Sequence, residues 1–227
     1  MKSINHQIEN EVKNAGVDFI RFLDISELTD AQNRGLPSAV LIGISIGPKF
    51  IKTVFDNPEY VPTHDDEYIQ TEEKAGHVTD EIAKMLVGRG YKAISQSDAG
   101  LIAAGAFNFD KKESVLPHKT VAIHGGLGWI GKNNLLVTPE YGAAQCLGTV
   151  LTDAPLKTTS HKQLVSKCGS CRTCTDICDK KVLKGKTWDT TISRDEMLDV
   201  HGCSICLKCL VHCPQTQAYA RRSQLGG

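Results

Sequence analysis

Eight cysteines in the last third of the chain repeat one spacing. Each half of the set reads Cys-x2-Cys-x2-Cys-x3-Cys, and a proline follows the final cysteine of the second half. The first half contains Cys168, Cys171, Cys174 and Cys178, and the second contains Cys203, Cys206, Cys209 and Cys213. Cysteine thiolates at this spacing are ligands of [4Fe–4S] clusters. The pattern therefore predicts a protein that handles electrons through two such clusters.

The spacing also predicts which cysteines share a cluster. Three cysteines at x2 spacing surround one cluster, whereas the fourth lies on the next helical turn and, in two-cluster ferredoxins, binds the other cluster. We therefore predict crossed ligation. The first cluster takes Cys168, Cys171, Cys174 and Cys213, and the second takes Cys203, Cys206, Cys209 and Cys178.

Two other interpretations of the cysteines are weaker. Structural zinc sites use Cys-x2-Cys pairs in sets of four and need neither a third cysteine at x2 nor a repeated fourth at x3. A disulfide framework needs an oxidising compartment, and nothing in the sequence suggests secretion. Evenly spaced Cys-x2-Cys runs are also poor for disulfide geometry.

Composition narrows the function classes. The chain has 227 residues with 26 Lys+Arg and 26 Asp+Glu, so the net charge is zero and no basic excess indicates nucleic-acid binding. The first 16 residues are polar and lack the apolar core of a secretory signal. The apolar stretch from Ala39 to Ile46 is too short to span a bilayer. We expect a cytoplasmic protein with no membrane contact.

The uneven placement of cysteines predicts a domain boundary. None precedes Cys146, and eight of the nine lie between Cys168 and Cys213. The polar segment from Leu156 to Lys162 is the predicted linker. We expect a cofactor-binding domain over residues 1–155 and a two-cluster ferredoxin-like domain over 156–227. Cys146 is expected to be a buried small hydrophobe.

The first domain is expected to mix helices and strands. Apolar periodicity predicts helices over 3–16 and 66–89 and strands over 17–23, 39–46, 91–94, 135–138 and 147–152. The run from His64 to Glu67 is interpreted as an acidic helix start rather than a metal site. The pattern fits α+β or α/β architecture and leaves that choice open.

A glycine-rich segment between His124 and Lys132 is the second informative feature. Its four glycines allow a ligand to approach the backbone closely. The match to a dinucleotide fingerprint is formal, because no helix of normal length and no acidic residue follow at the required places. A phosphate-binding loop would need Ser or Thr after Lys132, and Asn133 stands there.

Residues 122–156 resemble the epoxyqueuosine reductase family. The resemblance is carried by Gly-Leu-Gly-Trp-Ile-Gly-Lys at 126–132, Asn-Leu-Leu-Val-Thr at 134–138 and Leu-Gly-Thr-Val-Leu-Thr-Asp-Ala-Pro-Leu at 147–156, followed by the two cysteine runs. It is specific from Pro117 to Pro214 and most similar to the shorter relatives found in anaerobic bacteria and archaea. That family is itself similar to the reductive dehalogenases.

The resemblance implies an oxidoreductase that binds cobalamin in an α/β domain related to the nitroreductase-like fold, beside a two-cluster ferredoxin module. Electrons would pass through the clusters to cobalt, which reduces the substrate. A flat cofactor of this size needs close backbone, an aromatic wall and amide donors. The implied corrin-pocket residues are Gly126, Leu127, Gly128, Trp129, Gly131 and Lys132.

The sequence departs from the family at the proton donor. The family carries an acidic residue in a Val-Asp-x-Gly-Pro type stretch, and the corresponding region here reads Ser95-Gln-Ser-Asp98-Ala-Gly-Leu. Asp98 and Asp110 are the candidate catalytic acids. The zero net charge and the 14 residues after Cys213 argue against tRNA as the substrate, which leaves a small or unidentified molecule.

Two other functions remain open from the sequence. The chain could be a non-catalytic electron carrier that docks on a partner such as a corrinoid protein, or a reductase that uses flavin. A basic run in the cysteine region is either a solvated face or a docking patch for an acidic electron-donor protein. Its members are Lys162, Lys167, Arg172, Lys180, Lys181, Lys184 and Lys186.

Overall fold

A computed structural model describes residues 3–159 and 161–225. The chain divides into two compact units that are interleaved in sequence. The first, here called the sheet unit, comprises Met1–Ile44, Thr71–Gly126 and Cys146–Lys162, and the second, the cysteine unit, comprises Ser45–Gln70, Leu127–Gln145 and Gln163–Gly227. This division differs from the single boundary near residue 155 that the cysteine distribution predicted. Part of the predicted linker, Ser160, lies outside the described residues.

The interleaving has a physical basis in contacts that composition does not reveal. In the cysteine unit the Tyr219 hydroxyl donates to the carbonyl oxygen of Ile46 at 3.2 Å. The Ala143 N–H donates to the buried Thr216 hydroxyl at 2.9 Å. These bonds attach two earlier segments to the C-terminal helix, so the segments pack with the cysteine region.

The sheet unit is built on four strands in the order β1-β2-β8-β3. Antiparallel pairing sets Ile20 opposite Ile42 and Ile94 opposite Leu151. The strands are β1 (Phe19–Asp24), β2 (Ser38–Ser45), β8 (Gln145–Thr152) and β3 (Ala93–Ser95). Seven of the eight β2 residues are buried, which confirms the prediction that this aliphatic run lies in the interior.

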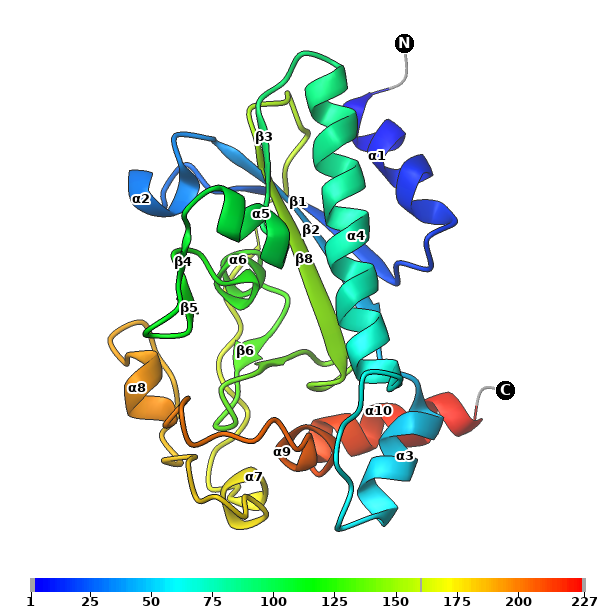
Figure 1. Ribbon diagram of the computed structural model, residues 1–227, viewed down its shortest axis with the longest axis vertical. Helices are drawn as coiled ribbons and strands as arrows, with labels where there is room; N and C mark the ends of the chain where they lie inside the picture. The colour runs from blue at the N-terminus through cyan, green and yellow to red at the C-terminus, as the bar shows by residue number, and fades with distance from the viewer. Residues whose placement is uncertain (1–2, 160, 226–227) are drawn as a thin grey trace. The chain divides into compact units, whose positions relative to one another are not determined.

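Two helices run beside these strands, α1 (Ile4–Lys13) and α4 (Glu67–Gly88) (Figure 1). Ile8 of α1 and Ile82 and Leu86 of α4 pack against Ile42 and Val150 of the sheet in one apolar core. Burial of these side chains is the main favourable term that holds helix to sheet. Both helices begin and end within a few residues of the predicted positions. Cys146 is buried in β8, as expected.

Short elements complete the sheet unit. They are α2 (Asp30–Asn33), α5 (Asp98–Ala103), β4 (Phe107–Asn108), β5 (Glu113–Ser114) and α6 (His118–His124). The Ser97 hydroxyl caps α5 by accepting the Gly100 N–H at 3.0 Å. The capping places Asp98 at the first helical position.

The cysteine unit consists mostly of loops and short helices. Its elements are α3 (Pro48–Asp56), β6 (Trp129–Ile130), β7 (Leu136–Val137), α7 (Thr173–Asp176), α8 (Arg194–Met197), α9 (Lys208–Val211) and α10 (Pro214–Leu225). Helix α3 contacts both α9 and α10. The predicted strand at 135–138 is present as the shorter β7, which pairs with β6. Across residues 3–159 and 161–225, no helix has the length and apolar character needed to cross a bilayer.

Candidate functional site

The cysteines of the two runs line two cavities in the cysteine unit. The first cavity, about 80 Å³, is lined by Cys168, Cys171, Cys174 and Cys213. The second, about 260 Å³, is lined by Cys178, Cys203, Cys206 and Cys209. Each cavity therefore brings together three cysteines of one run and the fourth cysteine of the other. These are the two sets that the spacing predicted as cluster ligands, and the ligation itself stays a prediction.

The electrostatics of the thiols agree with this grouping. Burial raises the pKa of the Cys174 thiol to about 11, and the charges of Cys168, Cys213 and Cys171 raise it further. Burial likewise raises the pKa of Cys209 to about 12, with further contributions from the other cysteines of its set and from Cys174. Such thiols stay protonated at neutral pH unless a cation binds them, because burial penalises the thiolate. Contacts between helix α7, which contains Cys174, and helix α9, which contains Cys209, place the two sets next to each other.

Among the described residues, the cysteines line two cavities and are not grouped around one metal-ion position. A zinc ion draws four thiolates to about 2.3 Å from one centre. In the part of the chain that the structure describes, no three His, Cys, Asp or Glu side chains are grouped to hold one metal ion. A cubane instead takes its four thiolates on four separate irons.

The second cysteine loop has an unusual backbone. Ile205 and Leu207 adopt φ values of +53° and +62°, in the left-handed region that L-residues rarely enter. Ile205 is β-branched and 60% exposed, so packing does not explain its conformation. The two turns curve the chain between Cys203 and Cys209 around the second cavity. Local strain of this kind is typical of binding loops.

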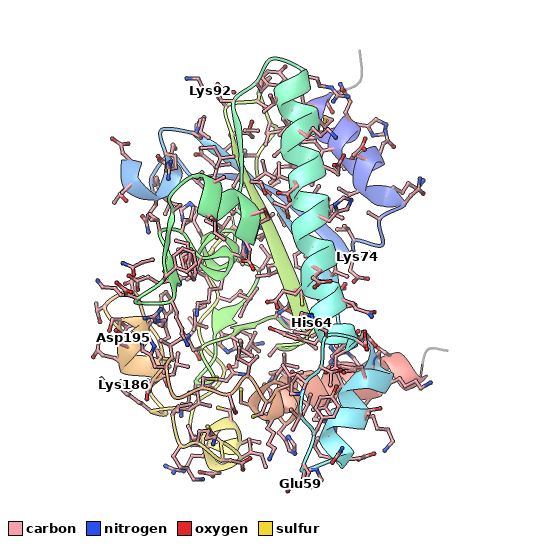
Figure 2. The ribbon with its side chains drawn as sticks, in the orientation of Figure 1. Glu59, His64, Lys74, Lys92, Lys186 and Asp195 are labelled. Carbon is pink, nitrogen blue, oxygen red and sulfur yellow. The ribbon has the colours of Figure 1, made fainter. Side chains whose placement is uncertain are left out.

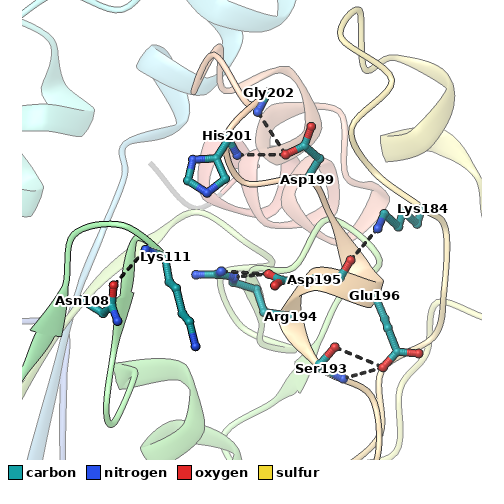
Figure 3. A network of polar contacts seen from close by, with 10 residues as sticks. All are labelled: Asn108, Lys111, Lys184, Ser193, Arg194, Asp195, Glu196, Asp199, His201 and Gly202. Atoms are coloured by element: carbon teal, nitrogen blue, oxygen red, sulfur yellow. Dashed lines mark hydrogen bonds and ion pairs between the residues drawn. The ribbon is translucent and has the colours of Figure 1, made fainter.

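The segment that leads into the second loop is held by its own polar contacts (Figure 3). Glu196 accepts both the backbone N–H and the hydroxyl of Ser193 at 3.1 Å, which caps α8. Asp199 accepts the N–H groups of His201 and Gly202 at 3.1 and 3.3 Å. These bonds fix the backbone immediately before Cys203.

The glycine-rich segment supports both cysteine loops. Lys132 Nζ donates to the carbonyl oxygens of Gly169 at 2.7 Å and Cys171 at 3.1 Å, in the first loop. The next residue, Asn133, donates from Nδ2 to the carbonyl oxygen of Cys209 at 3.2 Å, in the second loop. Adjacent residues thus tie two loops that lie far apart in sequence. In the sequence, Asn133 indicates only that Lys132 does not belong to a phosphate-binding loop.

The glycines of this segment are explained by packing within the chain. A Cβ atom on Gly128 would lie 2.2 Å from the Val137 carbonyl oxygen, and one on Gly131 would lie 2.4 Å from Asn133 Oδ1. Gly126 has φ of +67°, and its Cβ would lie 2.6 Å from His161 Cβ. Leu127 is half-buried. Of the residues implied for a corrin pocket, the structure places Trp129, Gly131 and Lys132 at the first cysteine cavity.

The two candidate acids lie in the sheet unit. Asp98 is exposed at the start of α5, and Asp110 is exposed in the turn after β4, where Lys111 N–H donates to Asn108 Oδ1 at 2.9 Å (Figure 3). Asp110 lines an open cavity of about 640 Å³ beside the β4–β5 hairpin.

A histidine that the sequence did not single out lies near Asp98. His118 Nδ1 is 2.8 Å from Thr149 Oγ1. Burial lowers the pKa of His118 to about 4, and the nearby Asp98 charge opposes this in part. The ring is therefore neutral at pH 7. A lone histidine in sequence carries no signal for such an environment.

Much of the basic run contacts the chain's own polar groups. Lys184 Nζ donates to the Asp195 carbonyl oxygen at 2.6 Å (Figure 3), and Lys186, beside α8 (Figure 2), pairs with Glu196 at 2.9 Å. Arg172 pairs with Asp176 at 3.3 Å. These contacts favour the interpretation of the run as a solvated face.

Comparison with known proteins gives curated relatives named epoxyqueuosine reductase. No family model matches the chain. It is 38% identical over 84 residues to epoxyqueuosine reductase of Lactococcus garvieae and 36% identical over 100 residues to that of Atelocyanobacterium thalassa. These alignments cover 36% and 44% of this chain and 23% and 28% of the relatives. The chain thus spans about a quarter of the length of these curated relatives.

Solved structures give the fold. A catabolic reductive dehalogenase aligns over 96% of this chain and 33% of its own, with 16% identity and a TM-score of 0.67. Epoxyqueuosine reductase from Bacillus subtilis aligns over 96% and 67%, with 16% identity and a TM-score of 0.57. The chain has the mixed helix-and-sheet fold of these two groups of reductases. The curated relatives confirm the resemblance to epoxyqueuosine reductases, which are oxidoreductases by name.

Proposed function

We propose that this chain is an iron–sulfur oxidoreductase that passes electrons through two [4Fe–4S] clusters to a cofactor, which reduces a substrate. The observation that carries the proposal is the exchange of the fourth cysteine between cavities: Cys213 lines the first and Cys178 the second. A pair of clusters with crossed ligands needs this arrangement. Each cluster, when bound, would supply one-electron transfer.

The nearness of the two cysteine sets supports transfer between them. Helix α7, which contains Cys174 of the first set, contacts helix α9, which contains Cys209 of the second set. An electron from a donor protein would enter one cluster and move to the other.

Cobalamin is the proposed electron acceptor, and its support comes from relatives. One solved structure with this fold bears a title that describes B12-dependent dehalogenation. In this chain the Cβ sides of Gly126, Gly128 and Gly131 are filled by the chain's own atoms, so these glycines do not form an open cradle. These glycines are therefore not proposed as contacts of a corrin ring. The substrate is proposed to be a small molecule, and Asp98 and Asp110 are the proposed candidates for the proton donor.

The experiment begins with anaerobic purification and cluster reconstitution. The proposal predicts about eight iron atoms per chain, and reduced protein with two electron paramagnetic resonance (EPR) signals. Titration with cobalamin is expected to change the corrinoid absorbance. Protein with two clusters but no cobalamin binding at micromolar concentration would leave a non-catalytic electron carrier as the function. Protein with stoichiometric zinc and no iron would refute the proposal.

A further inference from the structure

Trp129 carries a buried donor that lacks a partner. Its side chain is 3% exposed. Among the buried side-chain nitrogen and oxygen atoms of the described residues, Trp129 Nε1 is the one without a hydrogen-bond partner. Buried indole N–H groups usually find an acceptor, because an unpaired donor inside a protein is costly. The position therefore indicates an acceptor that the polypeptide itself does not supply.

The same side chain lines the first cysteine cavity. Trp129 contributes to its wall together with Cys168, Cys171, Cys174 and Cys213. The wall also contains the apolar Val137 and Pro214. The sulfur-rich lining makes this cavity the place where an acceptor for the indole would be found.

The ring is fixed in place from several sides. Trp129 in β6 pairs with Val137 in β7, and Gly128 packs against the Val137 carbonyl oxygen. Lys167 Nζ lies 6.0 Å from the ring centroid, in cation–π range. The indole is therefore held against the cavity and is not free to turn toward another acceptor.

We propose that Trp129 Nε1–H donates a hydrogen bond to a sulfur atom of the cluster held by the first cysteine set. The proposal rests on the proposed function, since it needs a cluster at that place. Hydrogen bonds to cluster sulfurs stabilise the more negative reduced state and so raise the reduction potential.

The charged residues around the two cavities also favour a higher reduction potential for the first cluster. Two basic residues, Lys132 and Lys167, line the first cavity. The second is lined by one residue of each sign, Lys180 and Asp179. The first cluster therefore has the higher potential. One electron leaves the reduced second cluster, which becomes oxidised, and enters the oxidised first cluster, which becomes reduced, and no bond forms or breaks.

The test is a redox titration of each cluster by EPR in Trp129→Phe. The variant keeps an aromatic ring and removes the N–H. We expect the equilibrium constant for one-electron reduction of the first cluster to fall by up to tenfold. This fall corresponds to a shift of its reduction potential by about 59 mV to more negative values, and the potential of the second cluster should be unchanged. Trp188→Phe is the matched control, because Trp188 belongs to the same unit and lines neither cysteine cavity. Both potentials should be unchanged in it.

A second measurement tests the proposal in case the Trp129→Phe variant does not retain the first cluster. Trp188→Phe protein labelled with ¹⁵N at the remaining indole should show ¹⁵N coupling to the reduced first cluster by electron–nuclear double resonance. Two intact clusters with unchanged potentials in Trp129→Phe, or no ¹⁵N coupling, would overturn the proposal. Native protein that binds no cluster at all would instead refute the proposed function.

Discussion

Asn133 donates a 3.2 Å hydrogen bond from its side-chain amide to the carbonyl oxygen of Cys209, one residue after Lys132 makes the equivalent tie to Cys171. The two bonds run from one short segment to both cysteine loops. The segment therefore contacts both loops, with Lys132 bonded to the first and Asn133 bonded to the second. This separation makes the two contributions testable one at a time.

Asn133→Ala should loosen the second loop. The loss of one part-buried hydrogen bond costs about 1 kcal/mol, and the Cys209 carbonyl loses its partner. We expect a chelator to remove the second cluster faster, and the decay of that cluster's EPR signal measures the rate. Lys132→Met is the matched comparison and should speed loss of the first cluster instead. Equal effects of both variants on both clusters would contradict separate supports.

Gly128→Ala should destabilise the cysteine unit. The new methyl group would lie 2.2 Å from the Val137 carbonyl oxygen, a backbone atom that cannot move alone. Overpacking of this kind costs about 1–3 kcal/mol or more. Urea unfolding under anaerobic conditions measures the loss. Gly88→Ala is the control, since its Cβ would meet nothing within 4 Å. Alanine at this helical position should raise the free energy of unfolding by about 0.5–1 kcal/mol.

Stability of the sheet unit should depend on pH through His118. Its folded pKa is about 4, below the ordinary value of 6.5, so the unfolded chain takes up the proton first on acidification. The neutral ring therefore contributes stability that is fully present above pH 6.5 and is lost as pH falls toward 4. The loss is of order 3 kcal/mol at most. Urea unfolding at pH 7 and pH 5 should differ less in His118→Gln. An identical pH dependence would contradict this assignment.

Ile205→Asn should relieve strain in the second loop. A left-handed conformation costs a β-branched residue roughly 1–2 kcal/mol, and asparagine tolerates it. Little packing is lost, because Ile205 is mostly exposed. We expect a higher unfolding midpoint for the variant, with Ile205→Val unchanged as the control. A lower midpoint for Ile205→Asn would show that the side chain stabilises the loop through contacts.

The cysteine grouping could be predicted from sequence because cubane geometry links spacing directly to position. The buried run of β2 was also predictable, since a continuous aliphatic stretch has few other places to lie. The roles of Lys132 and Asn133 were not, because each depends on loops more than 30 residues away. The environment of His118 likewise arises from the fold, where Thr149 and Asp98 come together around it.

The most direct test of the central claim is a comparison of EPR spectra from four reduced variants, each lacking one cysteine. Crossed ligation predicts that Cys178→Ala loses the same cluster signal as Cys203→Ala, and that Cys213→Ala loses the same signal as Cys168→Ala. The comparison needs no prior assignment of either signal. A Cys178→Ala spectrum that matches Cys168→Ala would contradict the account, since each run would then hold its own cluster.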